Sequence, residues 1–456
     1  GRWFESTLLY QKMTKEKNNK PSKELPVGFV DRQEKELLIR DFIISNIKEV
    51  MIKYGFQYLE TPSFEYSDSI GKFLPDKERP DEGVFSFRDE NKWLSLRYDL
   101  TAPLARYVAK NFLEIPKPFK RYQLGTVWRN EKPGPGRFRE FLQFDADFVG
   151  TKSLQADAEL CVMISEILEN CGLTKSEYII KISSRKITEE LFKKININEN
   201  QQKLTALRAL DKIDRLGWDG VKELLGVGRK DKSGDFTKGA NLKSEDIEVI
   251  ETTLKKKSPE TEDLAEILKI FKDYNFTNFE FDPSIVRGLE YYTGVIFEVN
   301  LKFDVKNKKG QVIQFGSIGG GGRYDNLVNN FGNFDAPATG ISIGLDRLVY
   351  ALMQKKEFKV KQSKPVVICV FDKNSMKEYI NVQTILRTAG ISAEIYPGES
   401  KLKKQMEYAN KIKSPAVILY GEDEIKLGKP TLRNLSSGME QSIKIKELVN
   451  EIKKII

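Results

Sequence analysis

The sequence of 456 residues contains no histidine and only three cysteines, Cys161, Cys171 and Cys369. Without histidine the chain cannot form a Ser-His-Asp triad or a Cys-His dyad, and it cannot bind zinc through imidazole. Three scattered cysteines are too few for a disulfide framework or a cage of thiolates. We therefore expect a reducing, cytoplasmic location, and any catalysis must come from carboxylates, arginines, backbone dipoles or a bound cation.

Long hydrophobic runs are also absent. No stretch approaches the roughly 18 consecutive apolar residues of a transmembrane helix, so no membrane association is expected. The first residues lack the apolar core of a signal peptide, and we expect the natural start at Met13, with a short native extension as the alternative. The net charge of +9 favours a polyanionic partner, although lysine-rich surfaces are often only solvated faces.

The chain is 40% hydrophobic and 31% charged, the balance of a globular protein with about two to four domains. Periodicity predicts the following elements along it: a helix over 34–54, a strand ending at Pro62, antiparallel strands from 84 to 149, and helices near 104–111 and 157–170. Charged helical segments follow, and then a pattern typical of antiparallel strands appears again. A charged linker precedes a β-α-β-α-β alternation. That alternation predicts a small α/β domain with a partly parallel sheet.

Arginines and acidic residues flank a Gly-Pro-Gly loop in VWRNEKPGPGRFREFLQFDADFVG, residues 127–150. A strand–loop–strand of this kind can aim the planar guanidinium of Arg129 at a phosphate. Phe141 alternates correctly along the second strand to lie beside that arginine, as a platform for adenine requires. The alternative is a surface hairpin with ordinary salt bridges, and this stretch alone does not decide between them.

Three further segments are rich in glycine, arginine and tyrosine. In RGLEYYTGVIFEV, residues 287–299, adjacent strand tyrosines would face opposite sides, one in a core and one in a site; two half-buried tyrosines are the commoner case. The four glycines of GSIGGGGRYDNL, residues 316–327, with Arg323 and Tyr324 predict a substrate wall rather than a flexible loop. GISIGLDRL, residues 340–348, predicts a strand that runs into a helix whose arginine suits a terminal phosphate.

Together the four segments resemble the class II aminoacyl-tRNA synthetases, and specifically the histidyl-tRNA synthetase family. The helix and strand that end at Pro62 resemble the first class motif, which forms the dimer interface. Residues 127–150 resemble the second motif and residues 340–348 the third. LRYDLTAPLARY at residues 96–107, RGLEYYTG and GGGGRYDNL are the segments that the histidine-specific family shares.

The resemblance implies an α/β (α+β) fold, with an antiparallel-sheet catalytic core, a helical insertion and a C-terminal α/β anticodon-binding domain. The implied boundaries are an N-terminal extension at 1–25, core at 26–184, insertion at 185–275, core at 276–353, linker at 354–364 and anticodon-binding domain at 365–456. The implied activity is histidine–tRNA ligation by a homodimer. ATP and Mg²⁺ activate L-histidine to histidyl-adenylate, and the histidyl group then passes to histidine tRNA.

The resemblance also implies roles for individual residues. Arg287 and Arg129 would be catalytic, through charge stabilisation at the α-phosphate. In the ATP site, Arg129 would bind the α-phosphate, Arg137 the outer phosphates and Arg347 the γ-phosphate. Glu131 would lie on the adenine side, and Phe141 would stack on the base. Histidine would be bound at its α-amino group by Asp99, Thr101 and Gln143, and at its imidazole by Asp147, Tyr292 and Tyr324, with Arg287 and Tyr291 in the same pocket.

The sequence departs from the family pattern at two places. Asp99 and Asp147 are shorter than the glutamates that many bacterial members carry. The loop at 132–136 differs from the loop that helps to read the extra 5′ guanine of histidine tRNA, so we expect weaker dependence on that nucleotide. The alternative function is that of a non-catalytic paralogue, the histidine-sensing regulatory subunit of ATP phosphoribosyltransferase. Such subunits usually lack the C-terminal domain and lose ATP-binding arginines, whereas this chain has both.

Overall fold

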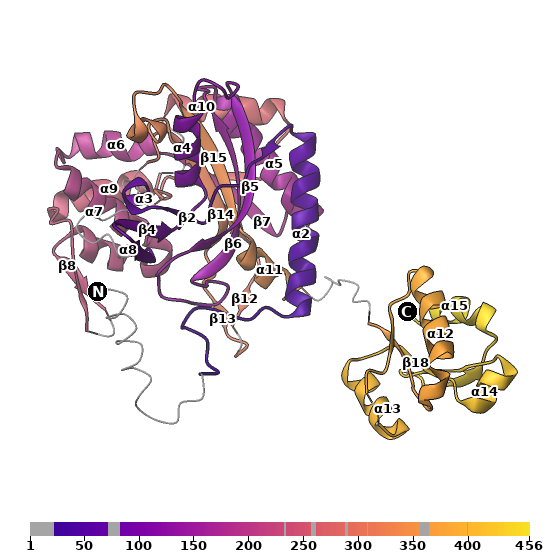
Figure 1. Cartoon of the computed structure of the whole chain (residues 1–456). Helices are drawn as coiled ribbons and strands as arrows, with labels where there is room; N and C mark the ends of the chain where they lie inside the picture. The colour runs from indigo at the N-terminus through magenta and orange to yellow at the C-terminus, as the bar shows by residue number, and fades with distance from the viewer. Residues whose placement is uncertain are drawn as a thin grey trace. The chain divides into compact units, whose positions relative to one another are not determined.

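An eight-stranded sheet is the centre of the first of two units into which the chain divides, Gly1–Phe358 and Lys359–Ile456 (Figure 1). The structure is a computed structural model that describes residues 22–71, 83–231, 234–256, 261–287, 291–307, 309–355, 364–398 and 400–456. The expected start at Met13 and most of the expected linker at 354–364 lie outside the described residues. The two units are described separately below.

The large sheet is antiparallel except at its two edges. Its strands run in the order β1 (Gln57–Tyr58), β5 (Phe119–Trp128), β6 (Glu140–Val149), β15 (Ala338–Gly344), β14 (Ser317–Arg323), β11 (Val295–Leu301), β7 (Tyr178–Ser184) and β10 (Phe279–Phe281). The outermost pairs, β1 with β5 and β10 with β7, are parallel. Strands distant in sequence are therefore neighbours at the middle of the sheet, where β6, β15 and β14 lie side by side.

The predicted helix over 34–54 is α2 (Glu34–Lys53), and its buried residues recur at helical spacing: Ile39, Ile43, Ile47, Val50 and Met51. It packs against α5 (Leu154–Asn170) and α11 (Leu345–Leu352). The strand predicted to end at Pro62 is wrong in extent: β1 ends at Tyr58, and a separate strand, β2 (Phe64–Tyr66), follows. Proline has no N–H to donate to a ladder, which explains the break.

The carboxylate of Asp346 fastens three segments of this unit. Its Oδ1 accepts a hydrogen bond from Arg32 Nε at 2.7 Å, and its Oδ2 accepts one from the main-chain N–H of Leu142 at 2.7 Å. Arg32 also donates to the carbonyl oxygen of Glu140 at 3.1 Å. The segment before α2, the start of β6 and the first turn of α11 are thus held at one point.

The first unit also contains three smaller parts. A three-stranded sheet, in the order β2, β4 (Lys92–Leu96) and β3 (Ser86–Asp89), lies in sequence with the helices α3 (Ser67–Gly71) and α4 (Thr101–Lys110). A helical segment separates β7 from β10; it contains α6 (Arg185–Lys194), α7 (Asn200–Leu210), α8 (Ile213–Leu225), the hairpin β8 (Gly228–Lys230) and β9 (Phe236–Lys238), α9 (Ser244–Leu254) and α10 (Glu262–Asp273). A short pair, β12 (Val305–Lys306) and β13 (Val312–Ile313), precedes β14.

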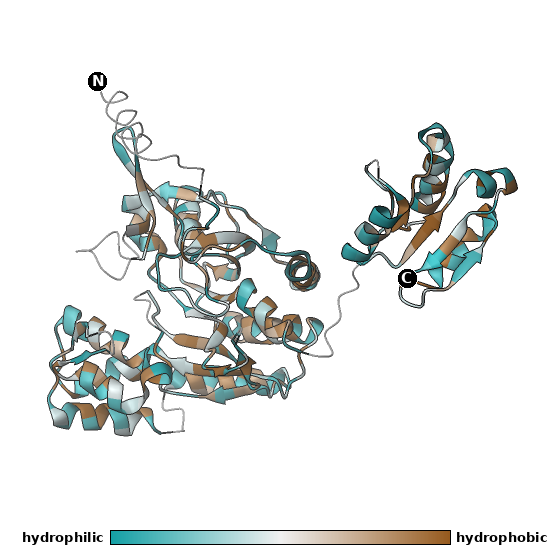
Figure 2. Ribbon diagram, turned by 90° about the horizontal axis from the view of Figure 1, so that it is seen from below, coloured by the Kyte–Doolittle hydropathy of each residue, from teal (hydrophilic) through white to brown (hydrophobic). Residues whose placement is uncertain are grey.

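The second unit is a five-stranded mixed sheet covered by helices. Its strands run in the order β17 (Ala393–Ile395), β16 (Val366–Ile368), β18 (Ala416–Leu419), β19 (Thr431–Asn434) and β20 (Glu440–Ser442). The first three strands are parallel, as the β-α-β-α-β alternation predicts, and the last two are antiparallel. Alternate strand residues pack against α12 (Met376–Thr388) and α15 (Ile445–Lys453) on one face and against α13 (Leu402–Lys411) on the other; α14 (Glu422–Leu427) follows β18. Figure 2 shows hydrophobic strands inside this unit beside strands that are hydrophilic.

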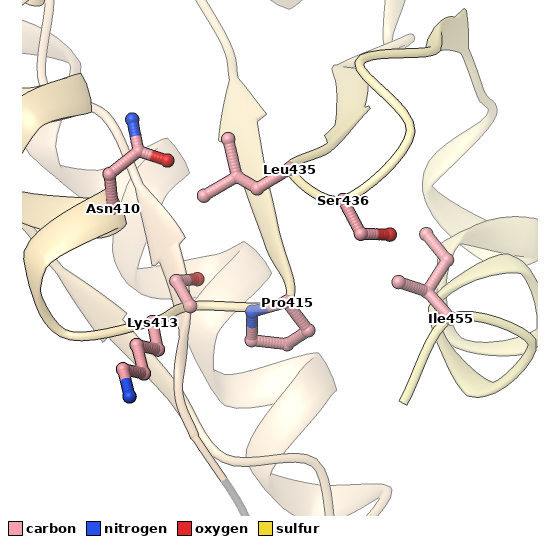
Figure 3. A pocket seen from close by; sticks show the side chains of 7 residues that line it. Asn410, Lys413, Pro415, Leu435, Ser436 and Ile455 are labelled. Atoms are coloured by element: carbon pink, nitrogen blue, oxygen red, sulfur yellow. The ribbon is translucent and has the colours of Figure 1, made fainter.

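A shallow pocket of about 330 Å³ lies on the second unit, beside Asn410, Lys413, Pro415, Leu435 and Ile455 (Figure 3). The sequence analysis singled out none of its lining residues. Lys413 is the only charged residue among the lining residues that the structure describes. This surface therefore lacks the converging charges that chemistry on a phosphate would require.

None of the helices in the described part of the chain combines the length and the apolar composition needed to cross a membrane.

Candidate active site

A cavity in the first unit brings together residues from segments that are far apart in the sequence. Its lining includes most of the predicted site residues: Asp99, Thr101, Arg129, Gln143, Asp147, Arg287, Tyr291, Tyr292 and Tyr324. The remaining lining residues come from the middle strands of the large sheet: Asp145, Gly320, Gly321, Gly340, Ile341 and Ser342. Aspartates, arginines and tyrosines thus line one cavity.

One end of the cavity is built around the start of α4. Asp99 Oδ1 accepts hydrogen bonds from the main-chain N–H groups of Thr101, at 3.2 Å, and Ala102, at 2.9 Å. These N–H groups belong to the first turn of the helix, where donors lack partners within the helix. Asp99 Oδ2 is buried, and within the described residues it finds no hydrogen-bond partner. Burial raises the pKa of this carboxyl group, and an ammonium group of a ligand would satisfy its free oxygen.

Asp145 connects this end to the middle of the cavity. Its Oδ2 accepts a hydrogen bond from Thr101 Oγ1 at 3.2 Å, and its Oδ1 accepts one from Gln143 Nε2 at 2.7 Å. Gln143 Oε1 in turn lies 3.5 Å from Arg129 Nη2, which donates to it. Burial, together with the neighbouring carboxylate of Asp147, raises the pKa of Asp145 to about 7. The side chain therefore exchanges its proton near neutral pH.

Asp147 stands at the other end of the cavity between two partners. The hydroxyl of Tyr324 donates to its Oδ1, and Arg121 Nη2 lies 3.0 Å from its Oδ2. A Cβ atom at Gly340, on the adjacent strand β15, would overlap Asp147 Oδ1, so this position requires glycine. Neutral imidazole offers one donor and one acceptor, and a carboxylate beside a phenol hydroxyl can satisfy both.

Arg287 enters the cavity from a strained segment of main chain. Its φ of 50° is in the left-handed region that L-residues rarely adopt. Burial by itself lowers the pKa of the Arg287 guanidinium. The nearby Tyr292 and Glu298 raise that pKa by more, so the net shift is upward and the group stays charged. A Cβ at Gly320 would lie 2.5 Å from Arg287 Nη1, so the absence of a side chain there makes room for the guanidinium.

The two adjacent tyrosines do not lie in a strand, so the prediction that they face opposite sides is wrong. Strand β11 begins only at Val295, and both Tyr291 and Tyr292 line the cavity. Their ring centroids are 4.8 Å apart, and the ring of Tyr291 meets that of Tyr324 edge-on at 5.8 Å. Residues 288–290 between Arg287 and this pair lie outside the described residues.

The glycine run at 319–322 is not a flexible loop, and Gly320 and Gly321 line the cavity. It forms most of strand β14, paired on both sides with β11 and β15. A Cβ at Gly321 would overlap the carbonyl oxygen of Gly340, so these strands approach more closely than side chains would allow. The flanking residues separate: Tyr324 lines the cavity, whereas Arg323 is buried in an ion pair with Asp157, outside the cavity lining.

A second cluster of predicted residues lies near Arg129. The guanidinium carbon of Arg129 is 5.2 Å from the centre of the Phe141 ring, as the alternation along β6 predicts, and its Nε donates to the carbonyl oxygen of Tyr98 at 3.1 Å. Glu131 and Arg137 pair with each other at 2.9 Å, with 42% and 55% of their side chains exposed. These exposed side chains can exchange partners when an anion arrives, because such surface pairs contribute little.

Arg347 is the most unusual member of this cluster. Its guanidinium carbon lies 4.6 Å from the centre of the Phe315 ring, and its Nε is buried with no hydrogen-bond partner within the described ranges. Burial, and then the positive charge of Arg137, lower the pKa of Arg347 to about 10. The charges of Arg137 and Arg129 oppose the charged form of Arg347, and that of Glu298 favours it. A bound anion would add to the effect of Glu298 and could form charge-assisted hydrogen bonds with the guanidinium.

Three residues at or near the site were not predicted as site residues. Asp145 could have been found, because Gln143, Asp145 and Asp147 alternate along a strand and share one face. Arg121 could not, because its position opposite Asp147 depends on how β5 pairs with β6. Arg185, at the start of α6, donates from Nη1 to the carbonyl oxygen of Val286, the residue before Arg287, at 3.0 Å. No pattern in the sequence indicated that contact.

A largely antiparallel sheet with a carboxylate-lined cavity, which arginines from separate segments of the chain reach, agrees with the catalytic core of a class II aminoacyl-tRNA synthetase. Residues 28–348 match the family described as histidyl-tRNA synthetase, and residues 364–455 match the anticodon binding domain. The chain belongs to the histidyl-tRNA synthetase family.

Individual relatives agree with this assignment. The chain is 46% identical over 460 residues to the histidine–tRNA ligase of Bartonella quintana, covering 94% of this chain and 92% of that one. It is 46% identical over 462 residues to the histidine–tRNA ligase of Rhizobium meliloti, covering 95% and 92%. The solved histidyl-tRNA synthetase of Nostoc sp. PCC 7120 is similar with a TM-score of 0.71 at 26% identity, covering 96% of this chain and 100% of that one.

Proposed function

We propose that this chain is a histidine–tRNA ligase that activates histidine with ATP and then transfers the histidyl group to tRNA. The observation that carries the proposal is the convergence of two arginines and three carboxylates on one cavity, in a chain that belongs to the histidyl-tRNA synthetase family. In the first step a carboxylate oxygen of histidine attacks the α-phosphorus of ATP, a new O–P bond forms and pyrophosphate leaves. In the second step a hydroxyl of the terminal ribose attacks the histidyl carbonyl carbon, and AMP leaves.

We assign histidine to the cavity, with its α-ammonium group at the end near α4. The free oxygen of Asp99 supports this orientation, since a cation would satisfy it. Thr101 and Gln143 flank that end, and Asp147 and Tyr324 would bind the imidazole at the other. Tyr291 and Tyr292 would close the pocket around the ring. A site of this kind rejects analogues that leave a buried polar group unpaired.

We assign ATP to the cluster around Arg129. Arg129 and Arg287 both line the cavity, so each can reach an α-phosphate whose reacting face points toward histidine. Phe141 beside Arg129 would stack on the adenine, with Glu131 on the adenine side. Arg137 and Arg347 would hold the outer phosphates. Charge that develops at the α-phosphate needs preorganised donors rather than a proton shuttle, so a chain without histidine can perform this chemistry.

Mg²⁺ enters the proposal as part of the substrate, MgATP. Magnesium is commonly held by substrate phosphates, water and one or two carboxylates. In the described part of the chain no group of three or more acidic or cysteine side chains could hold a metal ion. The structure therefore assigns no protein ligand set to the ion, and its chemistry would be to neutralise charge on the outer phosphates.

The second unit and the helical segment give tRNA two further places to bind. Residues 364–455 match an anticodon binding domain, and we propose that they contact the anticodon. We propose that the insertion at 185–275 holds the acceptor arm. We further propose a cytoplasmic enzyme, in agreement with three cysteines that are all free thiols.

We propose that the enzyme is a homodimer, with α2 and the strands that follow it at the interface. Helix α2 exposes Ile52 to 76%, and β1 is an edge strand of the large sheet. The adjacent three-stranded sheet exposes Phe64, Phe87 and Trp93. An exposed cluster of large apolar side chains on an edge of this kind marks a contact with another chain.

Histidine-dependent exchange of pyrophosphate into ATP tests the assignment. The wild-type chain should catalyse it, and Arg287→Met should reduce the rate by about 10²–10³, the loss that removal of one preorganised donor causes. Lys269→Met, on the exposed face of α10, is the control for the loss of a positive charge and should leave the rate unchanged. A regulatory paralogue would bind histidine without exchange; that function is not favoured, because the named relatives are ligases and the ATP arginines are present.

A further inference from the structure

Arg121 lies in the core beneath the cavity, and the cavity lining does not include it. It is the largest side chain that the described part of the chain buries completely, with 0% exposure. On β5 it is the register partner of Asp147 on β6. Its Nη2 lies 3.0 Å from Asp147 Oδ2 and donates to the carbonyl oxygen of Leu100 at 2.9 Å. One guanidinium nitrogen thus contacts both a carboxylate and the main chain of a turn.

These two contacts join two groups of residues that line the cavity. Leu100 sits between Asp99 and Thr101, which both line the end near α4, whereas Asp147 lines the end beside Tyr324. Because Nη2 makes both contacts, Arg121 ties Asp147 directly to the turn that carries Asp99 and Thr101. Histidine also has two ends that must be recognised at a fixed separation, its α-ammonium group and its imidazole.

Stability does not explain a buried charge at this position. A buried ion pair costs desolvation on both sides, and apolar residues of similar volume often replace such pairs without loss of stability. Two of the guanidinium nitrogens of Arg121, Nε and Nη1, are buried without a hydrogen-bond partner among the described residues. An arginine with so few hydrogen bonds is better explained by its effect on the cavity residues above it than by its contribution to stability.

The residues above it are three buried carboxylates, Asp99, Asp145 and Asp147. Burial raises the pKa of each, and the positive charge of Arg121 acts in the opposite direction on all three. Without that charge the pKa of Asp147 would be raised further, which favours the protonated form. A protonated carboxyl group donates a hydrogen bond, and the acceptor that an imidazole N–H requires would be lost.

We propose that Arg121 is a positioning residue for the amino acid substrate: from beneath the cavity it holds Asp147 in place as a hydrogen-bond acceptor for a ring N–H of histidine. It acts through Asp147 and the Leu100 turn and touches neither histidine nor ATP. The inference rests on the proposed function, since it assumes that the cavity binds histidine.

The test separates the two substrates in the pyrophosphate exchange reaction. Arg121→Met removes the charge and keeps the length of the side chain. We expect the KM for histidine to rise by at least about tenfold while the KM for ATP changes by less than about twofold, since the variant perturbs one subsite only. Arg121→Lys keeps the charge without the planar fork, and we expect it to recover part of the histidine affinity. Arg106→Met breaks the ion pair with Glu65 at 2.7 Å outside the cavity, and it should leave both KM values unchanged.

Thermal unfolding of each variant shows whether a loss is merely structural. An Arg121→Met protein that unfolds near the wild-type temperature, with the raised KM for histidine alone, supports the inference. An unchanged KM for histidine, or an equal rise in both KM values, overturns it. If Arg121→Met does not fold, Arg121→Lys decides: an unchanged KM for histidine in the folded variant overturns the inference, and a selective rise supports it. Absence of exchange in the wild-type enzyme would instead refute the proposed function.

Discussion

Replacing Arg347 by methionine should stabilise the fold while it removes ATP-dependent activity. Burial and the charge of Arg137 lower the pKa of Arg347 from 12.5 to about 10. One pKa unit corresponds to about 1.4 kcal/mol, so keeping the charged form costs the folded state roughly 3 kcal/mol at neutral pH. The sign follows from linkage: the folded state binds this proton less tightly than the unfolded chain, and stability would return only as the pH rises through about 10. Methionine keeps the packing on Phe315 without the charge.

Urea unfolding at neutral pH measures the effect, and exchange of pyrophosphate into ATP measures the loss of function. MgATP should raise the unfolding temperature of the wild type, because binding to the folded state stabilises it, and should raise that of Arg347→Met much less. Lys269→Met, on the exposed face of α10, should change the free energy of unfolding by no more than about 0.5 kcal/mol. A methionine variant that is less stable than the wild type would refute the reasoning.

Two further substitutions test the cavity itself. Asp145→Asn keeps an acceptor for Gln143 and removes a carboxyl group whose pKa is raised to about 7. The folded wild type loses stability as the pH rises from the ordinary carboxyl range through 7, because the folded state then loses a proton that it binds more tightly than the unfolded chain does. The stability gained by the variant should therefore be larger at pH 8 than at pH 5. Unfolding at both pH values measures this, the exposed Asp335→Asn is the control, and a gain independent of pH would contradict it. Gly340→Ala places a Cβ atom against Asp147 Oδ1. It should raise the KM for histidine by at least about tenfold and change the KM for ATP little. An equal change in both KM values in the exchange assay would contradict the assigned subsite.

The sequence predicts those parts of the fold that a local pattern encodes. Helix α2 follows from the spacing of Ile39, Ile43 and Ile47, and the alternation along β6 places Phe141 beside Arg129. Four glycines in succession cannot be assigned in this way, because glycine has no side-chain period. Their strand β14 exists because β11 and β15 pair with it on both sides.

The candidate site shows the same limit. The motif residues that resemble the family are gathered around one cavity, yet their roles remain predictions until substrates are bound. Arg121 contacts Asp147 because two strands pair in one register, and Arg185 reaches the carbonyl group before Arg287 across a separation of about a hundred residues. Neither contact leaves a local trace in the sequence, since both depend on tertiary packing.

The carboxylate of Asp346 connects two distant parts of the first unit directly. One of its oxygens accepts a hydrogen bond from Arg32, which precedes the helix proposed for the subunit contact. The other accepts one from the main chain of the strand that carries Phe141. Arg347 is the very next residue. A small shift imposed on the segment before α2 by a second subunit would therefore act, through the side chain of Asp346, next to the arginine proposed to bind the outer phosphates.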